Sequence, residues 1–219
     1  MFFVYAPQYD VLHLEGWTLK VATELETGHA ALWEAARKEL TVQLTNIERV
    51  VPDGPLQKIR TIVIYVHESS PETVCMAYHP DAQWLKDHKM EPEMAHCVEI
   101  GSASNFVSWT YEQPWMVLHE LAHAYHNQFL PQGFDDPDVK AAYDSAMKAK
   151  RYEAVLHWDG KTVRAYATTN PMEYFSECTE AYFGTNDFYP FVRAELMHAD
   201  PDGYALMQKE WGEPQKRVP

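Results

Sequence analysis

The sequence predicts an α+β fold, in which an N-terminal mixed sheet with helices precedes a mostly helical C-terminal lobe. β-Branched and alternating segments are concentrated before residue 110, whereas segments with helix-start signals dominate after it. A chain of 219 residues, 46% of them hydrophobic, can bury one such core. We therefore expect a single domain over residues 1–219. Its N-lobe would cover about residues 1–130 and its C-lobe about residues 131–219, with a cleft between them.

The first half of the chain supplies the sheet. Residues 11–14 and 18–21 flank a short Gly-containing segment and predict a β-hairpin. Residues 30–47 carry apolar side chains at steps of three and four, which indicates a long amphipathic helix. A Pro- and Gly-containing break at residues 52–55 ends it, and the β-branched residues 61–66 predict a strand.

The middle of the chain has weaker patterns. Residues 68–97 are rich in Pro, His and Glu and look dominated by loops, and residues 98–100 and 106–109 are interpreted as strands. Pro114 opens a helix that runs to about Leu130, because proline fits the first helical turn without losing a hydrogen bond.

The C-terminal half reads as helices around one hairpin. A helix is expected from Pro137 to about residue 150. Residues 152–158 and 161–167 then flank Asp159-Gly160, a good two-residue hairpin turn. Asn170-Pro171 starts a helix that ends at Gly184, and two short helices follow.

The composition disfavours some classes of binding partner. Lys and Arg number 18 against 32 Asp and Glu, a net charge of −14, which disfavours nucleic acid and anionic membranes. No stretch reaches the roughly 20 apolar residues of a membrane span. The apolar residues 1–5 have no basic flank and are too short for a signal peptide. We favour a secreted or extracytoplasmic location, with any signal peptide outside this sequence. The sequence indicates no oligomeric state.

The three cysteines form no zinc-binding CxxC pair. A disulfide between Cys75 and Cys97 would leave Cys178 free. Three buried thiols are the alternative, and the spacing does not decide between them.

The strongest motif is His119-Glu120-Leu121-Ala122-His123, within the helix that Pro114 opens. Histidines four residues apart project from one face of a helix and can meet one ion, and neutral imidazole suits zinc. Glu120 lies one step around the helix, where it can take a proton from a water that attacks a carbonyl. The uncharged, mostly apolar neighbours of the motif suit a buried helix.

A third ligand is expected downstream. Glu173 and Glu177 are four residues apart on one helical face, and two His with one Glu are a usual ligand set for catalytic zinc. Ligating histidines also commonly donate their second N–H to a carboxylate, so such a pair can fill both roles. Alternatively, Glu173 completes a capping box with Asn170. We expect Glu180 to be a solvated or helix-dipole residue.

His126 lies one turn beyond His123 on the same face of the helix. The chain lacks the glycine turn and distant third histidine of the metzincin pattern. We therefore expect His126 near the ligands or partly exposed, and not as a ligand itself.

These motifs resemble those of the gluzincin metallopeptidases. The closer likeness is to the group that contains the catalytic domain of anthrax lethal factor and related proline-specific endopeptidases, where an E-[FY]-F-x-E helix follows the histidine helix. Here the matching segment is Glu173-Tyr174-Phe175-Ser176-Glu177. The likeness covers about residues 115–183 and does not reach the first hundred residues, so it carries no cleavage specificity.

The resemblance implies a zincin-like fold and zinc-dependent hydrolysis of peptide bonds by an endopeptidase with one zinc ion. Glu173 would be the third ligand and Glu177 would orient a ligating histidine. Tyr166, seven residues before Glu173 and expected on the second hairpin strand, would donate a hydrogen bond to the oxyanion. The substrate would be a peptide or protein, extended along an edge strand formed by residues 98–109.

Two other functions stay open. One is a catalytically silent zinc-binding or protein-interaction module of the same fold, against which the presence of Glu120 counts. The other is a zinc hydrolase that acts on a non-peptide amide or ester, because the chemistry of the activated water would be the same.

Overall fold

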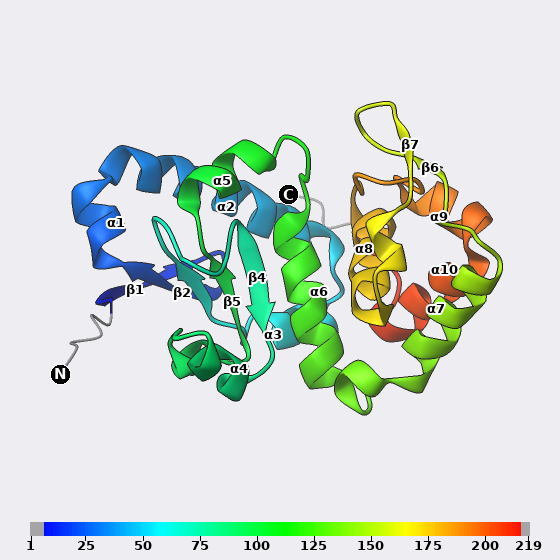
Figure 1. The fold of residues 1–219 in the computed structure, drawn as a ribbon, viewed down its shortest axis with the longest axis horizontal. Coiled ribbons are helices and arrows are strands. Elements are labelled where there is room, and N and C mark those ends of the chain that lie inside the picture. Colours follow the sequence, from blue (N-terminus) through cyan, green and yellow to red (C-terminus); the bar gives the residue numbers. More distant parts are fainter. Residues whose placement is uncertain (1–6, 216–219) are drawn as a thin grey trace.

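The computed structural model describes residues 7–215 and confirms an α+β fold with one mixed sheet. The apolar segment 1–5 considered above lies outside the described residues. Within the described part, no helix combines the length and apolar character needed to cross a membrane. The sheet and its helices occupy one half of the molecule and a helical lobe the other (Figure 1).

The sheet has five strands in the order β1-β2-β3-β5-β4. The pairs β1–β2 and β5–β4 are antiparallel, whereas β2–β3 and β3–β5 are parallel. Strand β4 is therefore an edge strand, and it lies beside helix α6 (Figure 1). The strands are β1 (Tyr9–Leu14), β2 (Trp17–Ala22), β3 (Ile64–Val66), β4 (Met76–His79) and β5 (Cys97–Ile100).

The expected N-terminal hairpin is confirmed as β1 and β2. Its two turn residues, Glu15 and Gly16, have φ values of 48° and 88°, the left-handed pair that a tight hairpin turn of this hand requires. Glycine suits the second position for another reason as well. A Cβ on Gly16 would lie 2.6 Å from Nε of Arg60.

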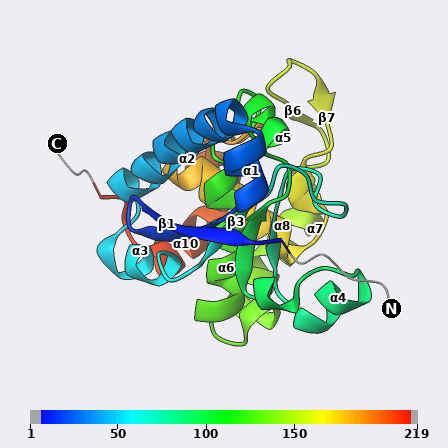
Figure 2. The ribbon, with the colours of Figure 1, turned by 90° about the vertical axis from the view of Figure 1, so that its left-hand side faces the viewer.

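Helices cover both sides of the sheet. The expected long helix is α2 (Ala30–Val50), which buries Trp33, Leu40 and Leu44 on its inward face. It lies with α1 (Thr23–Gly28) along one side, and α4 (Ala82–Asp87) lies on the other (Figures 1 and 2). Helix α3 (Asp53–Ile59) follows the Pro-Gly break and contacts α6.

One prediction for the middle of the chain is incomplete and another is wrong. Residues 68–97 contain long loop segments as expected, but they also hold β4, α4 and the short 3₁₀ helix η1 (Pro92–Met94). Residues 106–109 are not a strand but the end of helix α5 (Ala103–Trp109). Its N-cap Ser102 accepts a hydrogen bond from Asn105 N, and Ala103 and Phe106 are buried three residues apart. Residues 98–100 are a strand as expected, but an interior one.

The second half is helical as expected. Its helices are α6 (Met116–Phe129), α7 (Pro137–Lys148), α8 (Pro171–Phe183), α9 (Arg193–Ala199) and α10 (Pro201–Trp211). Asp136, Asn170 and Asp200 each precede a proline and cap the helix that follows. A short 3₁₀ helix, η2 (Gly133–Asp135), connects α6 to α7.

The hairpin around Asp159-Gly160 is shorter than expected. Only β6 (Val155–Leu156) and β7 (Thr162–Val163) pair, and Tyr166 lies beyond them in the 3₁₀ helix η3 (Tyr166–Thr168). The expectation that Tyr166 sits on a strand is therefore wrong. Thr168 Oγ1 donates to Ala165 O at 2.7 Å and tightens this turn, which leads directly into α8.

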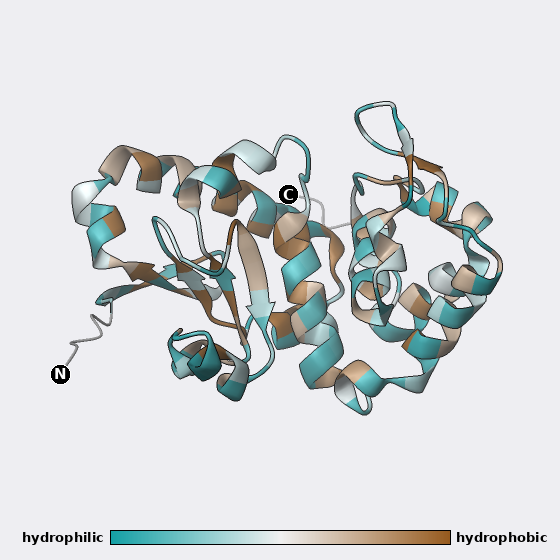
Figure 3. Cartoon of the chain, viewed as in Figure 1, coloured by the Kyte–Doolittle hydropathy of each residue, from teal (hydrophilic) through white to brown (hydrophobic). Residues whose placement is uncertain are grey.

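One hydrophobic core runs through both lobes. Helices α6 and α8 pack against each other, and Trp211 of α10 stacks on Tyr125 of α6 with ring centroids 4.0 Å apart. Figure 3 shows hydrophobic residues along the strands of the sheet and alternating with hydrophilic ones around α6. The lobes are thus two sides of one packed body.

The possible Cys75–Cys97 disulfide is absent, and all three cysteines are free. In the register of β4 and β5, Met76 pairs with Ile100 and His79 with Cys97. Cys75 and Cys97 consequently lie at opposite ends of the strand pair. Cys75 is buried instead against Met116, with 3.9 Å between their sulfur atoms.

Candidate metal centre

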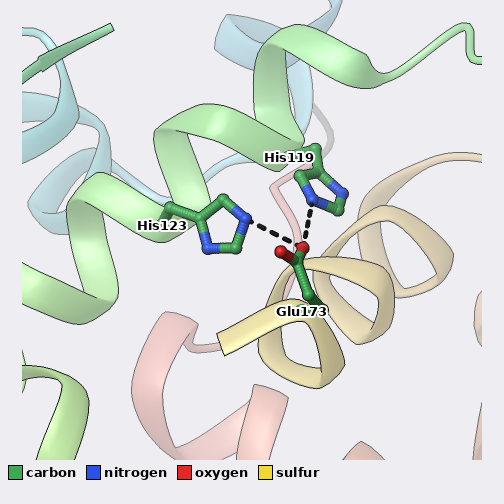
Figure 4. A group of neighbouring side chains, drawn as sticks. All are labelled: His119, His123 and Glu173. Atoms are coloured by element: carbon green, nitrogen blue, oxygen red, sulfur yellow. Dashed lines mark hydrogen bonds and ion pairs between the residues drawn. The ribbon is translucent and has the colours of Figure 1, made fainter. Parts of the chain in front are cut away.

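The two motif histidines of α6 and Glu173 of α8 converge on one point (Figure 4). Nε2 of His119 lies 3.0 Å, and Nε2 of His123 3.1 Å, from the same oxygen, Oε2 of Glu173. The ligand-type atoms of the three residues all lie within 4.8 Å of one another. The three side chains are 11%, 11% and 16% exposed, so they are shielded but reachable from the cleft.

Local sequence explains why Glu173 faces the histidines. Asn170 Oδ1 accepts a hydrogen bond from Glu173 N at 2.9 Å and fixes the first turn of α8. Ser176 Oγ donates to His119 O at 3.0 Å and ties α8 to α6. The carboxylate of Glu173 is engaged by the histidines and by Tyr166, so the residue does not serve merely to complete a capping box.

The hydrogen bonds between the histidines and Glu173 shift the pKa values of His119 and Glu173 in opposite directions. Burial by itself would lower the pKa of His119, but its hydrogen bonds to Glu173 and Glu180 outweigh burial and raise it well above the ordinary value. Burial would likewise raise the pKa of Glu173, yet the hydrogen bonds from His119 and His123 hold it well below the usual range. The carboxylate is therefore ionised at neutral pH.

The three residues could hold a metal ion, and their chemistry is of the kind that zinc prefers. Ligand atoms about 2.0–2.1 Å from a tetrahedral zinc ion lie roughly 3.3 Å from one another. The separations of 3.0 and 3.1 Å between Glu173 Oε2 and the two nitrogens are close to this value. Two imidazoles and one carboxylate are a usual set for catalytic zinc, which keeps its fourth position open. The three residues line a cleft of about 510 Å³ that can supply that position.

Glu120 lines the same cleft. Its Oε2 accepts a hydrogen bond from Tyr78 N of the edge strand β4 at 2.8 Å. Burial raises the pKa of Glu120, although the neighbouring His123 and His119 oppose the rise. A carboxylate with a raised pKa beside a candidate metal centre is suited to accept and return a proton.

Tyr166 also reaches the centre. Its hydroxyl donates to Glu173 Oε1 at 3.3 Å, and its ring centroid lies 6.4 Å from that of His119. Burial, reinforced by the charge of Glu173, raises the pKa of Tyr166 to about 12. The phenol therefore keeps its proton at neutral pH and remains a hydrogen-bond donor toward the cleft.

The second ring nitrogen of His119, Nδ1, is hydrogen-bonded to Glu180 and not to Glu177. Nδ1 of His119 lies 2.7 Å from Glu180 Oε1 and 3.8 Å from Glu177 Oε1. Glu177 instead accepts a hydrogen bond from Asn186 Nδ2 at 3.1 Å. The expectation that Glu180 is solvated is wrong, because it is 4% exposed. Glu180 is seven residues after Glu173 and therefore lies on the same helical face. This spacing could have indicated that Glu180 also faces the histidines.

The buried carboxyl groups behind His119 repel one another. Burial raises the pKa values of Glu177, Glu180 and Asp187, and repulsion from neighbouring carboxylates raises those of Glu177 and Glu180 further. The hydrogen bond and charge of His119 oppose this rise at Glu180. The cluster thus favours a proton on Nδ1 of His119, so that this nitrogen donates the hydrogen bond to Glu180.

His126 takes no part in the cleft. It is fully buried, packs between Phe134 and Phe175, and neither ring nitrogen has a hydrogen-bond partner within the described part of the protein. Burial, together with the charge of His123, lowers its pKa to about 4. The expectation of a role beside the ligands is not supported by its position, which is that of a neutral core residue.

Several cleft residues were not expected from the sequence. They come from the edge strand, the loop before α6 and the segments around β6, and the main ones are Met76, Ala77, Tyr78, Glu112, Gln113, His157, Trp158 and Phe188. Their segments carry no chemical motif, and only the fold brings them to the motif helix.

Comparisons of the chain with protein-family models, curated proteins and solved structures give no match. The chemistry of the site is therefore inferred from its residues and their geometry.

Proposed function

We propose that this chain is a zinc-dependent endopeptidase of the gluzincin type, with a zincin-like arrangement of sheet and helices. The observation that carries the proposal is the convergence of His119, His123 and Glu173 at a cleft that also contains Glu120. In this proposal those three residues hold one zinc ion.

The zinc ion, when bound, would lower the pKa of a water molecule and polarise the carbonyl of the scissile bond. Glu120 accepts the proton of the attacking water on its carboxylate and passes it to the leaving amine. Tyr78 N–H holds Glu120 Oε2, which keeps the carboxylate oriented for that transfer. The Tyr166 hydroxyl donates to the carbonyl oxygen as negative charge develops there. Glu180 fixes the ring of His119 through Nδ1.

Strand β4 supports a peptide as the substrate. It replaces residues 98–109 as the proposed edge strand, since residues 98–100 lie inside the sheet and 103–109 form a helix. Met76, Ala77 and Tyr78 of β4 line the cleft, so an extended peptide paired with β4 would pass the metal centre. An edge strand beside the cleft favours a peptide over a small non-peptide amide or ester, which has no main chain to pair.

The silent-module alternative is disfavoured by Glu120. A protein that only binds zinc has no need for a carboxylate that lines the cleft beside the ligands and is held there by Tyr78 N–H.

The test combines elemental analysis for zinc with cleavage of a diverse peptide library. We expect one zinc per chain and cleavage of internal peptide bonds. Glu120→Gln should keep the fold and the zinc but lose turnover, because the amide cannot accept the proton. Near-normal hydrolysis by this variant would contradict the mechanism. Zinc without any peptide cleavage by the parent protein would support the silent-module alternative.

A further inference from the structure

A second hollow follows the outer edge of β4. It has a volume of about 570 Å³ and is lined by residues 72–81 together with Trp84 of α4 and Trp109 of α5. It shares Met76, Ala77 and Tyr78 with the candidate metal cleft, so the two hollows meet along the edge strand. We call this second hollow the tryptophan groove.

The register of β4 shows which of its backbone groups face away from β5. Ala77 lies opposite Glu99, and Cys75 O accepts from Gly101 N at 2.8 Å, so alternate residues from Cys75 face β5. Met76 and Tyr78 therefore direct their backbone groups outward. Tyr78 N–H confirms this direction, but it is itself engaged by Glu120, so a peptide would pair with the other outward backbone groups of Met76 and Tyr78. Strand β4 is the last strand of the described sheet, so this outer edge has no neighbouring strand.

Alternation then separates the side chains of a bound peptide. In an extended chain, successive side chains point to opposite faces. If a peptide pairs with β4 as proposed, some side chains enter the metal cleft and their neighbours lie toward the tryptophan groove.

The groove is apolar. Val74, Trp84 and Trp109 are 64%, 44% and 39% exposed, although large side chains of this type normally contribute to a core. The Trp84 ring stacks on His88 at 3.9 Å, and Asp81 caps the helix that carries it, so Trp84 presents a fixed surface.

The charged residues that line the groove further restrict which substrate side chains it can accept. Its acidic lining residues are Glu72 and Asp81, and among the lining residues in the described part of the chain there is no lysine or arginine. Acidic side chains would therefore meet like charge here.

We propose that the tryptophan groove is a specificity subsite for bulky apolar side chains of the substrate. The occupant is the same extended peptide that passes the metal centre, with large apolar residues at alternate positions and no acidic residues among them. This inference rests on the proposed function and names the class of peptide it would act on.

The test measures binding without turnover. Zinc-loaded Glu120→Gln protein is titrated with a labelled peptide that carries leucine at every second position, and with matched peptides that carry serine or glutamate there. The leucine peptide should bind about tenfold more tightly than the serine peptide, and the glutamate peptide more weakly than both. Trp84→Ala and Trp109→Ala, added separately to Glu120→Gln, should each remove most of the leucine preference.

Val42→Ala is the matched control, because Val42 is a 48% exposed apolar residue on α2, outside both hollows. It should leave the preference unchanged. Thermal unfolding of every variant shows whether a loss of binding reflects a loss of fold. Equal binding of the leucine and serine peptides, or an undiminished preference in both folded tryptophan variants, would overturn the inference. If discrimination persists but the parent protein cleaves none of the peptides, the proposed function fails and the binding groove stands.

Discussion

Around Glu173 and around Glu99, two histidines approach one carboxylate, yet the atoms are arranged differently. At Glu173, both histidine Nε2 atoms point to the same oxygen, at 3.0 and 3.1 Å. At Glu99, each oxygen has its own histidine: His67 Nδ1 lies 2.7 Å from Oε1, and His79 Nε2 lies 2.7 Å from Oε2. The donor atoms converge in the first centre and diverge in the second.

The surroundings of Glu99 and Glu173 differ as well. Glu99 is fully buried on the interior strand β5, and Thr73 Oγ1 also donates to its Oε2 at 2.6 Å. Its carboxylate is thus satisfied by protein groups alone. Glu173 lies at the wall of a cleft, with the carboxylate of Glu120 and the phenol of Tyr166 nearby. A metal site needs convergent donors and an open position, and residue type alone does not supply them.

The Glu99 centre has a structural role that serves the cleft. Thr73 precedes β4 and His79 is the last residue of that strand, so Glu99 anchors the edge strand whose Tyr78 N–H holds Glu120. Burial would raise the pKa of Glu99, but hydrogen bonds from His67, His79 and Thr73 hold it well below the usual range. The ionised carboxylate therefore stabilises the fold.

The largest effect separating the two centres is expected from their tyrosines. Tyr166→Phe should lower the turnover number by about 10²–10³, the usual cost of one oxyanion donor, with little change in zinc content or Michaelis constant. Tyr9 is the matched control, since its hydroxyl lies 2.7 Å from His67 Nε2 in the Glu99 centre. Tyr9→Phe should leave turnover nearly unchanged. Steady-state kinetics on both variants checks this. Full activity of Tyr166→Phe would reduce Tyr166 to a residue of the cleft wall.

A smaller effect is expected behind His119. Glu180→Ala should weaken zinc binding by about 10–100-fold, because His119 loses the acceptor of its Nδ1–H. Glu177→Ala, which removes a neighbouring buried carboxyl 3.8 Å from Nδ1, should weaken it less. Competition with a chelator of known affinity measures both. The reverse order would return the orienting role to Glu177.

The smallest effect concerns stability and should spare the metal. Glu99→Gln should lower the free energy of unfolding by about 1–3 kcal/mol and leave zinc stoichiometry unchanged. The lowered pKa of Glu99 also fixes the pH dependence. Its contribution is complete above the unfolded carboxyl pKa of about 4.3 and is lost as the pH falls through the lower folded value. Urea unfolding across this acid range should show a shallower loss for the variant. Parallel curves for the two proteins would contradict this.

The sequence predicts the helices of this molecule better than its sheet edge. Asn170-Pro171 and Pro137 mark helix starts through local capping, and the structure has helices there. Residues 106–109 look like a strand by composition, but Ser102 caps a helix and Phe106 packs into the core. Strand β4 was not predicted, because its four residues form a strand only by pairing with β5, which lies farther along the chain.

For the candidate site, helical spacing predicted that His119 and His123 share a face, and the usual ligand set of catalytic zinc added Glu173. The structure brings these residues and Glu120 to one cleft. Spacing has a limit, however. It could not choose between Glu177 and Glu180, because both lie near His119 and the choice depends on how α8 packs against α6. For His126, helical spacing was misleading. It has the spacing of the motif face, yet Phe134 and Phe175 enclose it in the core.

The most direct test of the difference between the two centres is the zinc stoichiometry and affinity of Glu173→Ala, measured beside the parent protein and Glu99→Gln. If the convergent centre holds the ion, the parent and Glu99→Gln bind one zinc per chain with similar affinity. Glu173→Ala then loses the metal, since two histidines alone hold zinc poorly. Zinc bound by Glu173→Ala with the affinity of the parent protein would contradict the assignment of the metal centre to His119, His123 and Glu173.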